Sequence, residues 1–573
     1  MASLRLIPLR NFAVVAFLGA FLFKWFQVQV PAEVAAFPPQ LPIGEWPPWV
    51  IYTSVFGIIF AAQAAAFTFY SVLIYPFFVS PLRHLPMPSG RIPLLGHGRD
   101  LRIYGPGVMS RQWFKELPDA GLFRLHWHGN QEIIIVRSPQ ALADILVKNS
   151  YTFEKPDFAR EFLAFIIGWA LLTTEGDEHK KQRRNMLPAF SFRHIKDLYP
   201  LFWSKSVEVV SAMTEEHRKN MDADGYADME ISSWSVRSGL DIIGLAATGI
   251  DFGAVRDPNS PLAQSYYCLN PDPSDFVLLG LRAFLPGFIF SWLPLPRVWR
   301  VSKATKHLRR VCRELIADKQ QKVANKEDSG VDILSVALRG NLFSDDELVD
   351  QMMTFLSAGH ETTAASLVWA LYLLAKHPDV QDRLRKEIRE NLPSPDAPST
   401  GAGIASTDVD GLPYLNAVCS EALRTNSPVP ATIRVAMENT TVAGQYIPKN
   451  TIFALPIWAI NTDPQLWGED AAEFRPERWL TPEQGGTSKV NAGSGGATSN
   501  YAFMTFIHGP HSCIGGAFSK SEMACLLAAW IGRFDFRLKD ERLLDERNIQ
   551  VNPSVVAKPE GGMVMRTKLV EGW

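Results

Sequence analysis

The chain has 573 residues, with 57 lysines and arginines against 59 aspartates and glutamates, and a formal net charge of −2. Apolar residues make up 47% of the chain and charged residues 20%, which is close to ordinary globular composition. This composition excludes a disordered or collagen-like chain, and the near-zero charge argues against a nucleic-acid-binding protein. Length alone suggests about three or four domains, although one large enzyme core plus a membrane segment fits the same length.

The N-terminal region contains two apolar stretches. The longer one, residues 46–82, has 37 residues without a single Asp, Glu, Lys or Arg, and about 20 apolar residues are enough to span a bilayer. A buried core helix is the alternative for this stretch. The shorter one, residues 11–23, follows Arg5 and Arg10. It has three interpretations: a first membrane span, a helix lying in the interface, or a signal-peptide core with a cleavage site near Ala36.

Charges that flank the longer stretch predict its orientation. Glu33 and Glu45 precede it. Basic residues follow it, at Arg83, Arg91, Arg99 and Arg102. Under the positive-inside rule, the large C-terminal part then faces the cytosol, whichever interpretation of the shorter stretch is right.

A segment dense in proline and glycine follows the apolar region. Proline restricts its own backbone and that of the residue before it, so we expect residues 83–99 to form a semi-rigid hinge. We therefore predict an anchor over residues 1–82, this hinge, and one folded domain over residues 100–573. Within that domain, long helical periodicities mix with short strand-like runs such as residues 132–136.

The strongest helix signal covers residues 344–377. It begins with a capping box at Ser344–Glu347 and contains no proline. About 32 residues at 1.5 Å each give a helix of roughly 48 Å, long enough to cross a domain. Near its middle, residues 357–363 read Ser-Ala-Gly-His-Glu-Thr-Thr, and such small residues leave room for a group to lie against the helix. A glycine at a helix crossing is the alternative. The motif is not a zinc-protease site, because Ala364 stands where the second histidine is needed.

Three further patterns occur in the C-terminal half. Glu421 and Arg424 are three residues apart on a predicted helix, where a solvated ion pair is the simplest interpretation. Residues 474–479 read Phe-Arg-Pro-Glu-Arg-Trp, and residues 506–515 read Phe-Ile-His-Gly-Pro-His-Ser-Cys-Ile-Gly before an apolar helical pattern. The two glycines of the last motif allow a tight loop with backbone amides directed at the sulfur of Cys513, ahead of a helix N-terminus. These conditions favour a thiolate that ligates a metal.

The five cysteines, at positions 268, 312, 419, 513 and 525, are odd in number and contain no C-x-x-C pair. They do not indicate a disulfide framework, so we expect most of the chain to lie in a reducing compartment. Cys513 is the candidate ligand, and the other four are expected to be ordinary packing residues.

Taken together, these motifs resemble those of the cytochrome P450 haem-thiolate monooxygenases. The loop Phe506-x-x-Gly-x-His-x-Cys-x-Gly515, the element Ala358-Gly-x-Glu-Thr-Thr363, Glu421-x-x-Arg424 and Phe474-x-Pro-x-Arg478 occur in the order and spacing of that family. The resemblance covers roughly residue 80 to the C-terminus, and the cysteine loop is its most specific part. It implies a mainly α fold with a smaller β region: a single large haem domain behind an N-terminal transmembrane anchor. The double apolar N-terminus looks most like filamentous-fungal members.

The resemblance also implies the chemistry of the site. Cys513 would ligate the iron of haem b through its thiolate. Thr362 would hold a water molecule, and Glu361 would feed protons to the reaction of O2, which is general acid work. Ala358 and Gly359 would leave space for oxygen and substrate.

Haem propionates need cations. The segment Gly176–Arg184 matches the W-x-x-x-R helix of the family with histidine in place of tryptophan, so His179 and Arg183 are implied propionate contacts. Arg434 is a third, and His511, which replaces the arginine commonest at its position, is another cofactor-binding candidate. The resemblance assigns a buried structural ion-pair network to Glu421, Arg424 and Arg478.

Other stretches receive roles through the same resemblance. Substrate contacts are implied at residues 158–172, 355–363 and 428–433. Residues 276–299 are expected to form an access lid that dips into the bilayer, with a plain core contact as the alternative. The exposed basic side chains of Lys180, Lys181 and Arg184 are candidates for docking an acidic reductase.

The implied activity is the insertion of one oxygen atom of O2 into an apolar organic substrate, by hydroxylation or epoxidation in secondary or lipid metabolism. Because this chain carries no flavin or nicotinamide motif, NADPH-derived electrons would come from a separate membrane-bound NADPH–cytochrome P450 reductase. The expected location is the endoplasmic reticulum membrane, with no nucleic-acid partner. Two alternatives remain: a haem-thiolate isomerase that does not activate O2, and a membrane-tethered haem-binding protein without turnover.

Overall fold

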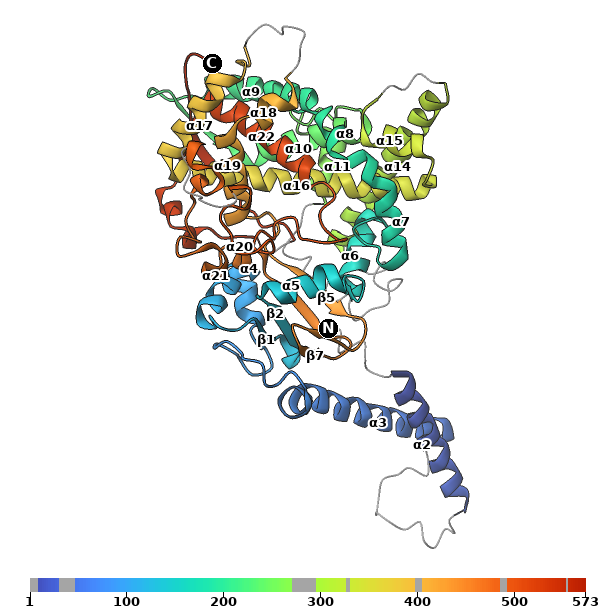
Figure 1. Cartoon of the computed structure of the whole chain (residues 1–573). Coiled ribbons are helices and arrows are strands. Elements are labelled where there is room, and N and C mark those ends of the chain that lie inside the picture. The colour runs from blue at the N-terminus through green and yellow to red at the C-terminus, as the bar shows by residue number, and fades with distance from the viewer. Residues whose placement is uncertain are drawn as a thin grey trace. The chain divides into compact units, whose positions relative to one another are not determined.

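The computed structural model describes residues 9–29, 47–269, 295–325, 330–396, 404–484, 492–552 and 555–573 (Figure 1). The chain divides into two compact units. The N-terminal unit comprises Met1–Arg99 and Arg124–Ile133, and the main unit comprises Asp100–Phe123 and Ile134–Trp573. The expected lid at residues 276–299 lies outside the described residues except for its last five.

Helices α2 (Leu9–Gln29) and α3 (Pro48–Phe69) of the N-terminal unit pack against each other. The ring of Phe12 lies 6.3 Å from that of Phe60 and 5.7 Å from that of Phe67, in edge-to-face geometry. Helix α3 continues without a break into the π-helix η2 (Tyr70–Val79). Together they form the one described helix, Trp49–Val79, that is long and apolar enough to cross a membrane, whereas the apolar part of α2 is shorter.

The end of this helix contains a proline and receives a hydrogen bond from a side chain. Pro76 lies inside the π-helix and has no N–H to donate to the preceding turn. The side-chain amide of Asn130 donates to the carbonyl of Val72 at 2.9 Å. Asn130 is buried and has a φ of 53°, directly after Gly129 with a φ of 68°. The left-handed turn at η3 (His128–Asn130) therefore ties residues 128–130 to the helix next to Pro76.

A buried ion pair holds the same helix end. Arg124 donates to the carbonyl of Pro76 at 3.0 Å and pairs with Glu132 at 2.9 Å. The second carboxylate oxygen of Glu132 accepts from the hydroxyl of Ser80 at 2.7 Å. The end of the candidate membrane helix is thus fixed to residues 124–132 by interactions within the N-terminal unit. The expected hinge at residues 83–99 consists of turns, an isolated bridge between Ile92 and Gly96, and the start of α4.

The main unit is mostly helical, as the resemblance implies. Its α-helices are α4 (Gly98–Glu116, whose first two residues belong to the N-terminal unit), α5 (Pro139–Ala143), α6 (Asp157–Ile167), α7 (Gly176–Met186), α8 (Phe192–Lys196), α9 (Tyr199–Asn220), α10 (Ile231–Thr248), α11 (Pro261–Tyr267), α14 (Pro296–Ala324), α15 (Ile333–Gly340), α16 (Asp345–Lys376), α17 (Pro378–Asn391), α18 (Ser406–Asp410), α19 (Pro413–Thr425), α20 (Ile457–Asn461), α21 (Pro464–Trp467) and α22 (Gly516–Arg533). Short 3-10 or π turns are η4 (Asp144–Lys148), η5 (Leu187–Phe190), η6 (Pro476–Trp479), η7 (Pro482–Gln484), η8 (Ala492–Ser494), η9 (Glu541–Leu544) and η10 (Glu546–Asn548).

The β part is smaller. The largest sheet has the order β1-β2-β8-β5-β3, formed by β1 (Leu122–His126), β2 (Glu132–Val136), β8 (Ile452–Leu455), β5 (Thr432–Ala436) and β3 (Phe153–Glu154). The predicted strand at residues 132–136 coincides with β2. A second sheet joins β4 (Tyr226–Glu230), β10 (Val564–Leu569) and β9 (Phe534–Leu538), and a third joins β6 (Thr440–Val442) to β7 (Gln445–Ile447). Antiparallel pairing places Glu154 opposite Val435 and Arg434 opposite Phe453.

Helix α16 crosses the middle of the helical part (Figure 1). The predicted capping box is confirmed: the Ser344 amide donates to the Glu347 carboxylate at 2.7 Å, and the Ser344 hydroxyl accepts from the Glu347 amide. Leu348–Leu356 (except Asp350) and Thr363–Leu374 are buried in the apolar core that α16 shares with α9, α10, α19 and α22.

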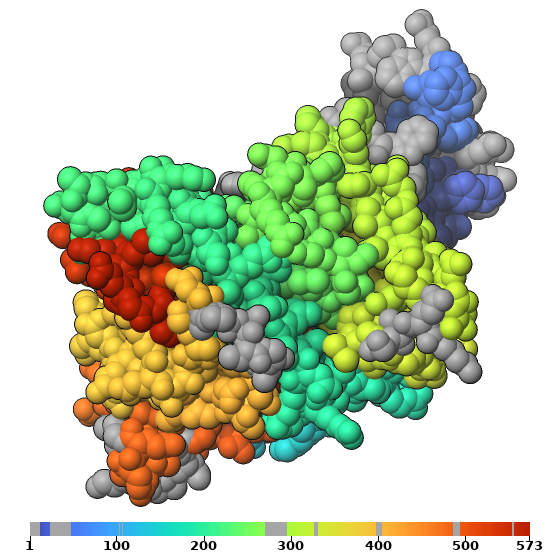
Figure 2. All heavy atoms as spheres, turned by 90° about the horizontal axis from the view of Figure 1, so that it is seen from above, coloured from blue at the N-terminus to red at the C-terminus, as the bar shows by residue number. Residues whose placement is uncertain are grey.

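Segments far apart in the chain close this core. Figure 2 shows C-terminal residues (red) lying between a segment near residue 220 (green) and one near residue 380 (yellow). Strand β10 pairs with β4, and Arg389 of α17 donates to the carbonyls of Val570 and Glu571. The chain terminus is therefore part of the main unit's structure.

The contribution of the hydrogen bond from Asn130 to the carbonyl of Val72 is testable. We expect Asn130→Gly, which keeps the left-handed turn but removes the amide, to weaken the helix end by about 1 kcal/mol. Amide hydrogen exchange over residues 72–80, measured with the protein in lipid nanodiscs, should accelerate roughly fivefold. Asn341→Gly is the matched control, since Asn341 also has a left-handed φ, of 46°, but caps α15. Equal exchange in wild type and Asn130→Gly would contradict this role.

Candidate functional site

The cysteine loop is closed by its own backbone. The amide of Cys513 donates to the carbonyl of Phe506 at 2.9 Å, and that of Ser512 donates to Gly509 at 3.0 Å. Gly509 has a φ of 76°, and a Cβ at this position would lie 2.0 Å from the carbonyl oxygen of Leu146. Only glycine fits there, which explains one of the two glycines of the motif.

Cys513 combines an exposed residue surface with a thiol that protein atoms surround. The residue is exposed, yet burial by the surrounding protein raises the pKa of the Cys513 thiol. The amide of Gly515, which donates to the sulfur, and the charge of Arg183 act in the opposite direction. This environment suits a thiolate once a metal cation binds it. In contrast, Cys312, Cys419 and Cys525 are buried packing residues, and burial raises the pKa of each thiol.

The described residues contain no group of side chains that could hold a metal ion by themselves. Among residues 9–29, 47–269, 295–325, 330–396, 404–484, 492–552 and 555–573, no group of three or more His, Cys, Asp or Glu side chains is arranged to hold an ion. A single thiolate therefore fits a metal that brings its other ligands with it, as the iron of a haem does.

The middle of α16 faces open space. Ala358 is exposed, and Glu361 and Thr362 are partly exposed, although the helix is buried on both sides of this stretch. The hydroxyl of Thr362 donates to the carbonyl of Ala358 at 2.8 Å. Glu361 accepts from Lys558 at 2.8 Å. The exposure of this stretch leaves space beside the acid and hydroxyl residues of the central helix.

Gly359 has a different role from the one expected. A Cβ at Gly359 would lie 2.8 Å from the side chain of Ile243 on α10, and a Cβ at Gly239 of α10 would lie 3.0 Å from the carbonyl oxygen of His360. The helix-crossing interpretation is therefore correct for Gly359, because the two helices approach closely there. Ala358, not Gly359, faces the open space.

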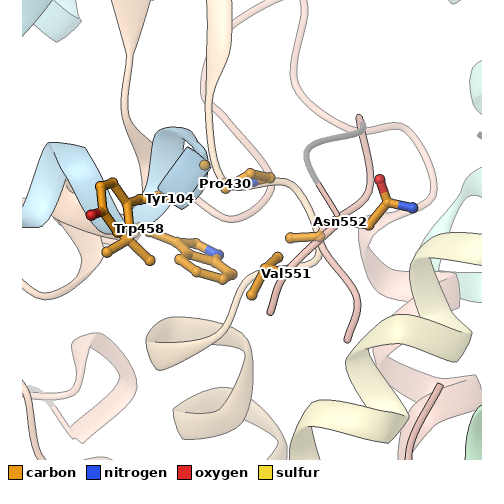
Figure 3. Close-up of a pocket in the computed structure, with 9 residues that line it drawn as sticks. Tyr104, Pro430, Trp458, Val551 and Asn552 are labelled. Atoms are coloured by element: carbon orange, nitrogen blue, oxygen red, sulfur yellow. The ribbon is translucent and has the colours of Figure 1, made fainter. Parts of the chain in front are cut away.

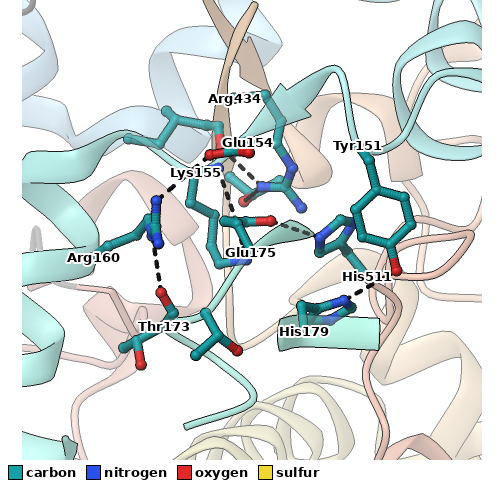
Figure 4. Close-up of polar contacts among 12 residues, drawn as sticks. Tyr151, Glu154, Lys155, Arg160, Thr173, Glu175, His179, Arg434 and His511 are labelled. Atoms are coloured by element: carbon teal, nitrogen blue, oxygen red, sulfur yellow. Dashed lines mark hydrogen bonds and ion pairs between the residues drawn. The ribbon is translucent and has the colours of Figure 1, made fainter. Parts of the chain in front are cut away.

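His179 and His511 come together in a polar cluster (Figure 4). Their rings stack with centroids 4.2 Å apart and an interplanar angle of 20°. The hydroxyl of Tyr151 lies 3.2 Å from Nδ1 of His179. His511 Nε2 donates to Glu175 at 2.7 Å, and Glu175 also forms an ion pair with Lys155. Sequence reasoning identified neither Lys155 nor Glu175, because β3, α7 and the cysteine loop meet only in the fold.

The members of this cluster differ in how their surroundings shift their pKa values. Burial alone raises the pKa of Glu175, but hydrogen bonds from His511 and Lys155 hold it at about 2. Burial, with the neighbouring His511 and Lys155, lowers the pKa of His179 to about 3. Burial also outweighs the attraction of Glu175 and lowers the pKa of His511. Both imidazoles are then neutral at pH 7 and act as hydrogen-bonding groups.

Arg434 supplies a buried positive charge beside the cluster. It projects from β5, and within the described part of the chain its side-chain hydrogen bonds go to Thr432 and Ile433 next to it. Burial lowers its pKa, with Glu175 as the opposing acid. Within the described residues no ion pair joins Arg434 to an acid. Because Lys155 and Arg434 together outnumber the one carboxylate, the cluster fits additional carboxylates such as haem propionates.

Arg183 lies at the cysteine loop instead. Its guanidinium donates to the carbonyl of Ser512 at 2.6 Å and to the Ser512 hydroxyl at 3.0 Å. Its charge acts on Cys513, as noted above. The structure therefore places His179, His511 and Arg434 near one another, and places Arg183 where it supports the loop.

The network around Glu421 is buried. Glu421 pairs with Arg424 and with Arg478, each at 2.8 Å, and both of the Glu421 and Arg424 side chains are 0% exposed. Trp479 donates to the same carboxylate at 2.8 Å. The solvated interpretation of the pair is wrong, because η6 packs over α19 and covers it. The structural network implied by the resemblance is present.

A cysteine loop thus lies ahead of α22, and the central helix is exposed beside its acid and hydroxyl residues. Comparison with known proteins identifies the family: the sequence model of the family "Cytochrome P450" matches residues 86–566. The chain belongs to the cytochrome P450 family.

Its relatives are fungal. The chain is 41% identical over 531 residues to cytochrome P450 monooxygenase sphH of Aspergillus fumigatus, covering 91% of this chain and 94% of that protein. It is 37% identical to cytochrome P450 monooxygenase ALT8 of Alternaria alternata and 38% identical to cytochrome P450 monooxygenase buaD of Petromyces alliaceus. Each comparison covers 91% of this chain, and they cover 95% and 94% of the two relatives.

The chain is therefore a cytochrome P450 monooxygenase. Membership implies the use of haem iron, O2 and a reductant delivered by a redox partner, with an apolar substrate.

The buried network predicts a large stability effect. Arg424→Gln leaves the Glu421 carboxylate short of its main partner in the core, so we expect a loss of about 3–5 kcal/mol in the free energy of unfolding. The matched control is Arg383→Gln, which removes a half-exposed partner of Glu477 and should cost less than about 1 kcal/mol. Denaturant unfolding of the two variants measures both values. Similar losses in the two variants would show that burial of the network is not decisive.

Proposed function

We propose that this chain is a membrane-anchored monooxygenase that inserts one oxygen atom of O2 into an apolar organic substrate, by hydroxylation or epoxidation. The other oxygen atom leaves as water. The observation that carries this proposal is the exposed residue Cys513, whose sulfur accepts a hydrogen bond from the Gly515 amide. The open stretch of α16 at Glu361 and Thr362 supports it.

The residues present fit haem b. Cys513 would ligate the iron, and His179, Arg434 and Lys155 would receive the propionates. Neutral His511 gives its single N–H to Glu175, so it would contribute by holding that carboxylate beside the cations. Arg183 uses two donors on Ser512, and its other N–H groups remain for a propionate. When bound, the haem supplies the redox-active iron at which O2 is activated.

Two residues of α16 would deliver protons to the reaction. Because the Thr362 hydroxyl donates its hydrogen to the Ala358 carbonyl, its oxygen is left as an acceptor that can hold a water molecule. Glu361, one residue earlier, would move protons to that water. A positioned acid of this kind contributes typically about 10²–10⁴-fold to a rate. The intact pair favours O2 activation over a haem-thiolate isomerase or a non-catalytic haem carrier.

Electrons would come from NADPH through a separate membrane-bound NADPH–cytochrome P450 reductase. The exposed side chains of Lys180, Lys181 and Arg184 on α7 are our candidates for docking its acidic surface. Lys180 pairs with Asp177 on its own helix, and Lys181 reaches Glu347 at 3.2 Å. Helix α7 also carries Arg183, which donates to Ser512, so the helix with this basic surface contacts the cysteine loop directly.

We infer a location in the endoplasmic reticulum membrane, with the catalytic domain in the cytosol. The apolar helix Trp49–Val79 and the arginines that follow it support this orientation. In this arrangement residues 1–82 are the anchor, 83–99 the hinge and 100–573 the haem domain. An apolar substrate dissolved in the bilayer would reach residues 158–172, 355–363 and 428–433, which suits secondary or lipid metabolism.

The thiolate assignment has a spectroscopic test. We expect the reduced, CO-bound protein to show the red-shifted Soret band of thiolate ligation, and Cys513→Ala to lose it, because alanine offers no ligand. Cys268→Ala is the control, since Cys268 is a half-buried cysteine far along the chain from the loop. Retention of the band in Cys513→Ala would refute the assignment.

A second test distinguishes a monooxygenase from an isomerase and from a haem carrier. With purified reductase, the holoenzyme should consume NADPH and O2, and Thr362→Val should divert electrons from product to hydrogen peroxide because the water site is lost. Product formation from an oxygenated substrate without NADPH would support an isomerase instead. A protein that shows the CO band but consumes no NADPH would support a haem carrier.

A further inference from the structure

The acid of the α16 motif has a cation partner from the C-terminal segment. Nζ of Lys558 donates to Oε1 of Glu361 at 2.8 Å, and the two side chains are 22% and 14% exposed. They are 197 residues apart in the chain, so no sequence motif connects them. Within the described residues no hydrogen bond reaches Oε2 of Glu361. One carboxylate oxygen is therefore held, and the other is available.

The backbone around Lys558 is fixed on both sides. The amide of Ala557 donates to the carbonyl of Pro428 at 2.8 Å, and the carbonyl of Ala557 accepts from the indole of Trp369 at 2.9 Å. Trp369 lies on α16 itself, about two turns after Glu361. The helix that carries the acid thus also holds the segment that brings its partner.

The residues that follow Lys558 add to this fixation. Pro559 restricts the backbone of Lys558 to extended conformations. The carbonyl of Lys558 accepts from the amide of Asn552 at 3.0 Å, in a short antiparallel pairing that includes a bridge between Val551 and Pro559. Figure 3 shows Val551 and Asn552 on this C-terminal segment, close to Trp458 and Pro430. The side chain of Lys558 therefore starts from a defined backbone position.

The pair is enclosed enough for the charges to matter. At partial exposure, a carboxylate that loses its ammonium partner keeps neither full hydration nor a counter-charge, so it moves to another rotamer. The neighbouring His360 does not replace the cation. It is buried, burial lowers its pKa, and its Nδ1 is 2.6 Å from the carbonyl of Leu356. Lys558 is the cation that determines where the Glu361 carboxylate lies.

We propose that Lys558 is a positioning residue for proton delivery: it holds Oε1 of Glu361 and thereby presents Oε2 to the water at Thr362. This inference rests on the proposed function of Glu361 as the acid. Lys558 touches neither substrate nor haem in this role, and acts only through the carboxylate that it orients.

The test uses holoenzyme with purified reductase and with O2 as the only added electron acceptor, so that no organic substrate is needed. The readouts are the ratio of hydrogen peroxide to water formed per NADPH, and the solvent deuterium isotope effect on NADPH oxidation. A displacement of about 1 Å at a reacting group can cost up to about 100-fold, so we expect Lys558→Gln to raise the peroxide-to-water ratio roughly tenfold. It should also change the isotope effect in the same direction as Glu361→Gln.

Matched variants separate charge from packing. Lys558→Arg, which keeps a cation, should restore most of the wild-type ratio. Lys568→Gln, the same change at an exposed site of β10, should leave it unchanged. Wild-type values in Lys558→Gln, with altered values in Glu361→Gln, would overturn the role of Lys558 alone. If Glu361→Gln also behaves as wild type, or if the wild type consumes no O2 with NADPH, the proposed function itself fails, and the role of Lys558 with it.

A stability cycle tests the contact without any turnover. Lys558→Gln and Glu361→Gln should each lower the melting temperature, and the double variant should lower it by clearly less than the sum, because the two residues act on one interaction. Additive shifts would show that the residues do not interact, and would overturn the proposal.

Discussion

The structure depends on the packing of one long helix, α16, which is buried on both sides of an open middle. Leu348–Leu356 (except Asp350) and Thr363–Leu374 are covered by the apolar core shared with α9, α10, α19 and α22. At the middle of α16, Gly359 and Gly239 let α16 and α10 approach closely on one side, while Ala358 is exposed and Thr362 partly exposed. Neighbouring positions of α16 thus have opposite surroundings: Gly359 packs tightly against α10, and Ala358 is exposed. The glycines provide the contact and the small and polar residues provide the site.

The cysteine loop is held both by hydrogen bonds within the loop and by contacts to residues that are distant in the sequence. Its own backbone closes it through Phe506 and Gly509, and Leu146 leaves room only for glycine. From outside, Arg183 of α7 grips Ser512, and His511 is tied to Glu175. Because α7 supplies Arg183 and His179 and begins directly after Glu175, one short helix sets both the support of the loop and the polar cluster beside it. A change in α7 would therefore disturb the cysteine loop, although Arg183 and Cys513 are 330 residues apart in the chain.

Charge pairs in this protein are used for placement more than for stability. The Glu421 network fixes η6 on α19 where no solvent reaches it, and a buried pair of this kind gains little net free energy while specifying geometry. The Glu132–Arg124 pair performs a similar task at the end of the candidate membrane helix, next to the carbonyl of Pro76. The ion pair of Lys558 with Glu361 extends this principle to the acid of the α16 motif.

The sequence by itself determined the local elements and the identity of the family: the capping box of α16, strand β2, the glycine-flanked loop of Cys513, the apolar helix after residue 46, and the motifs that belong together in a cytochrome P450. These features depend on residues within about one or two turns of each other, so their pattern is legible. Only the tertiary structure decided that Gly359 serves a helix crossing, that Glu421 and Arg424 are buried, and that Arg183 lies on Ser512. The tertiary structure alone showed the contacts of Glu175 with Lys155 and His511, and of Lys558 with Glu361. Each of these contacts joins elements that are distant in the chain, and a single sequence does not specify which distant elements pack together.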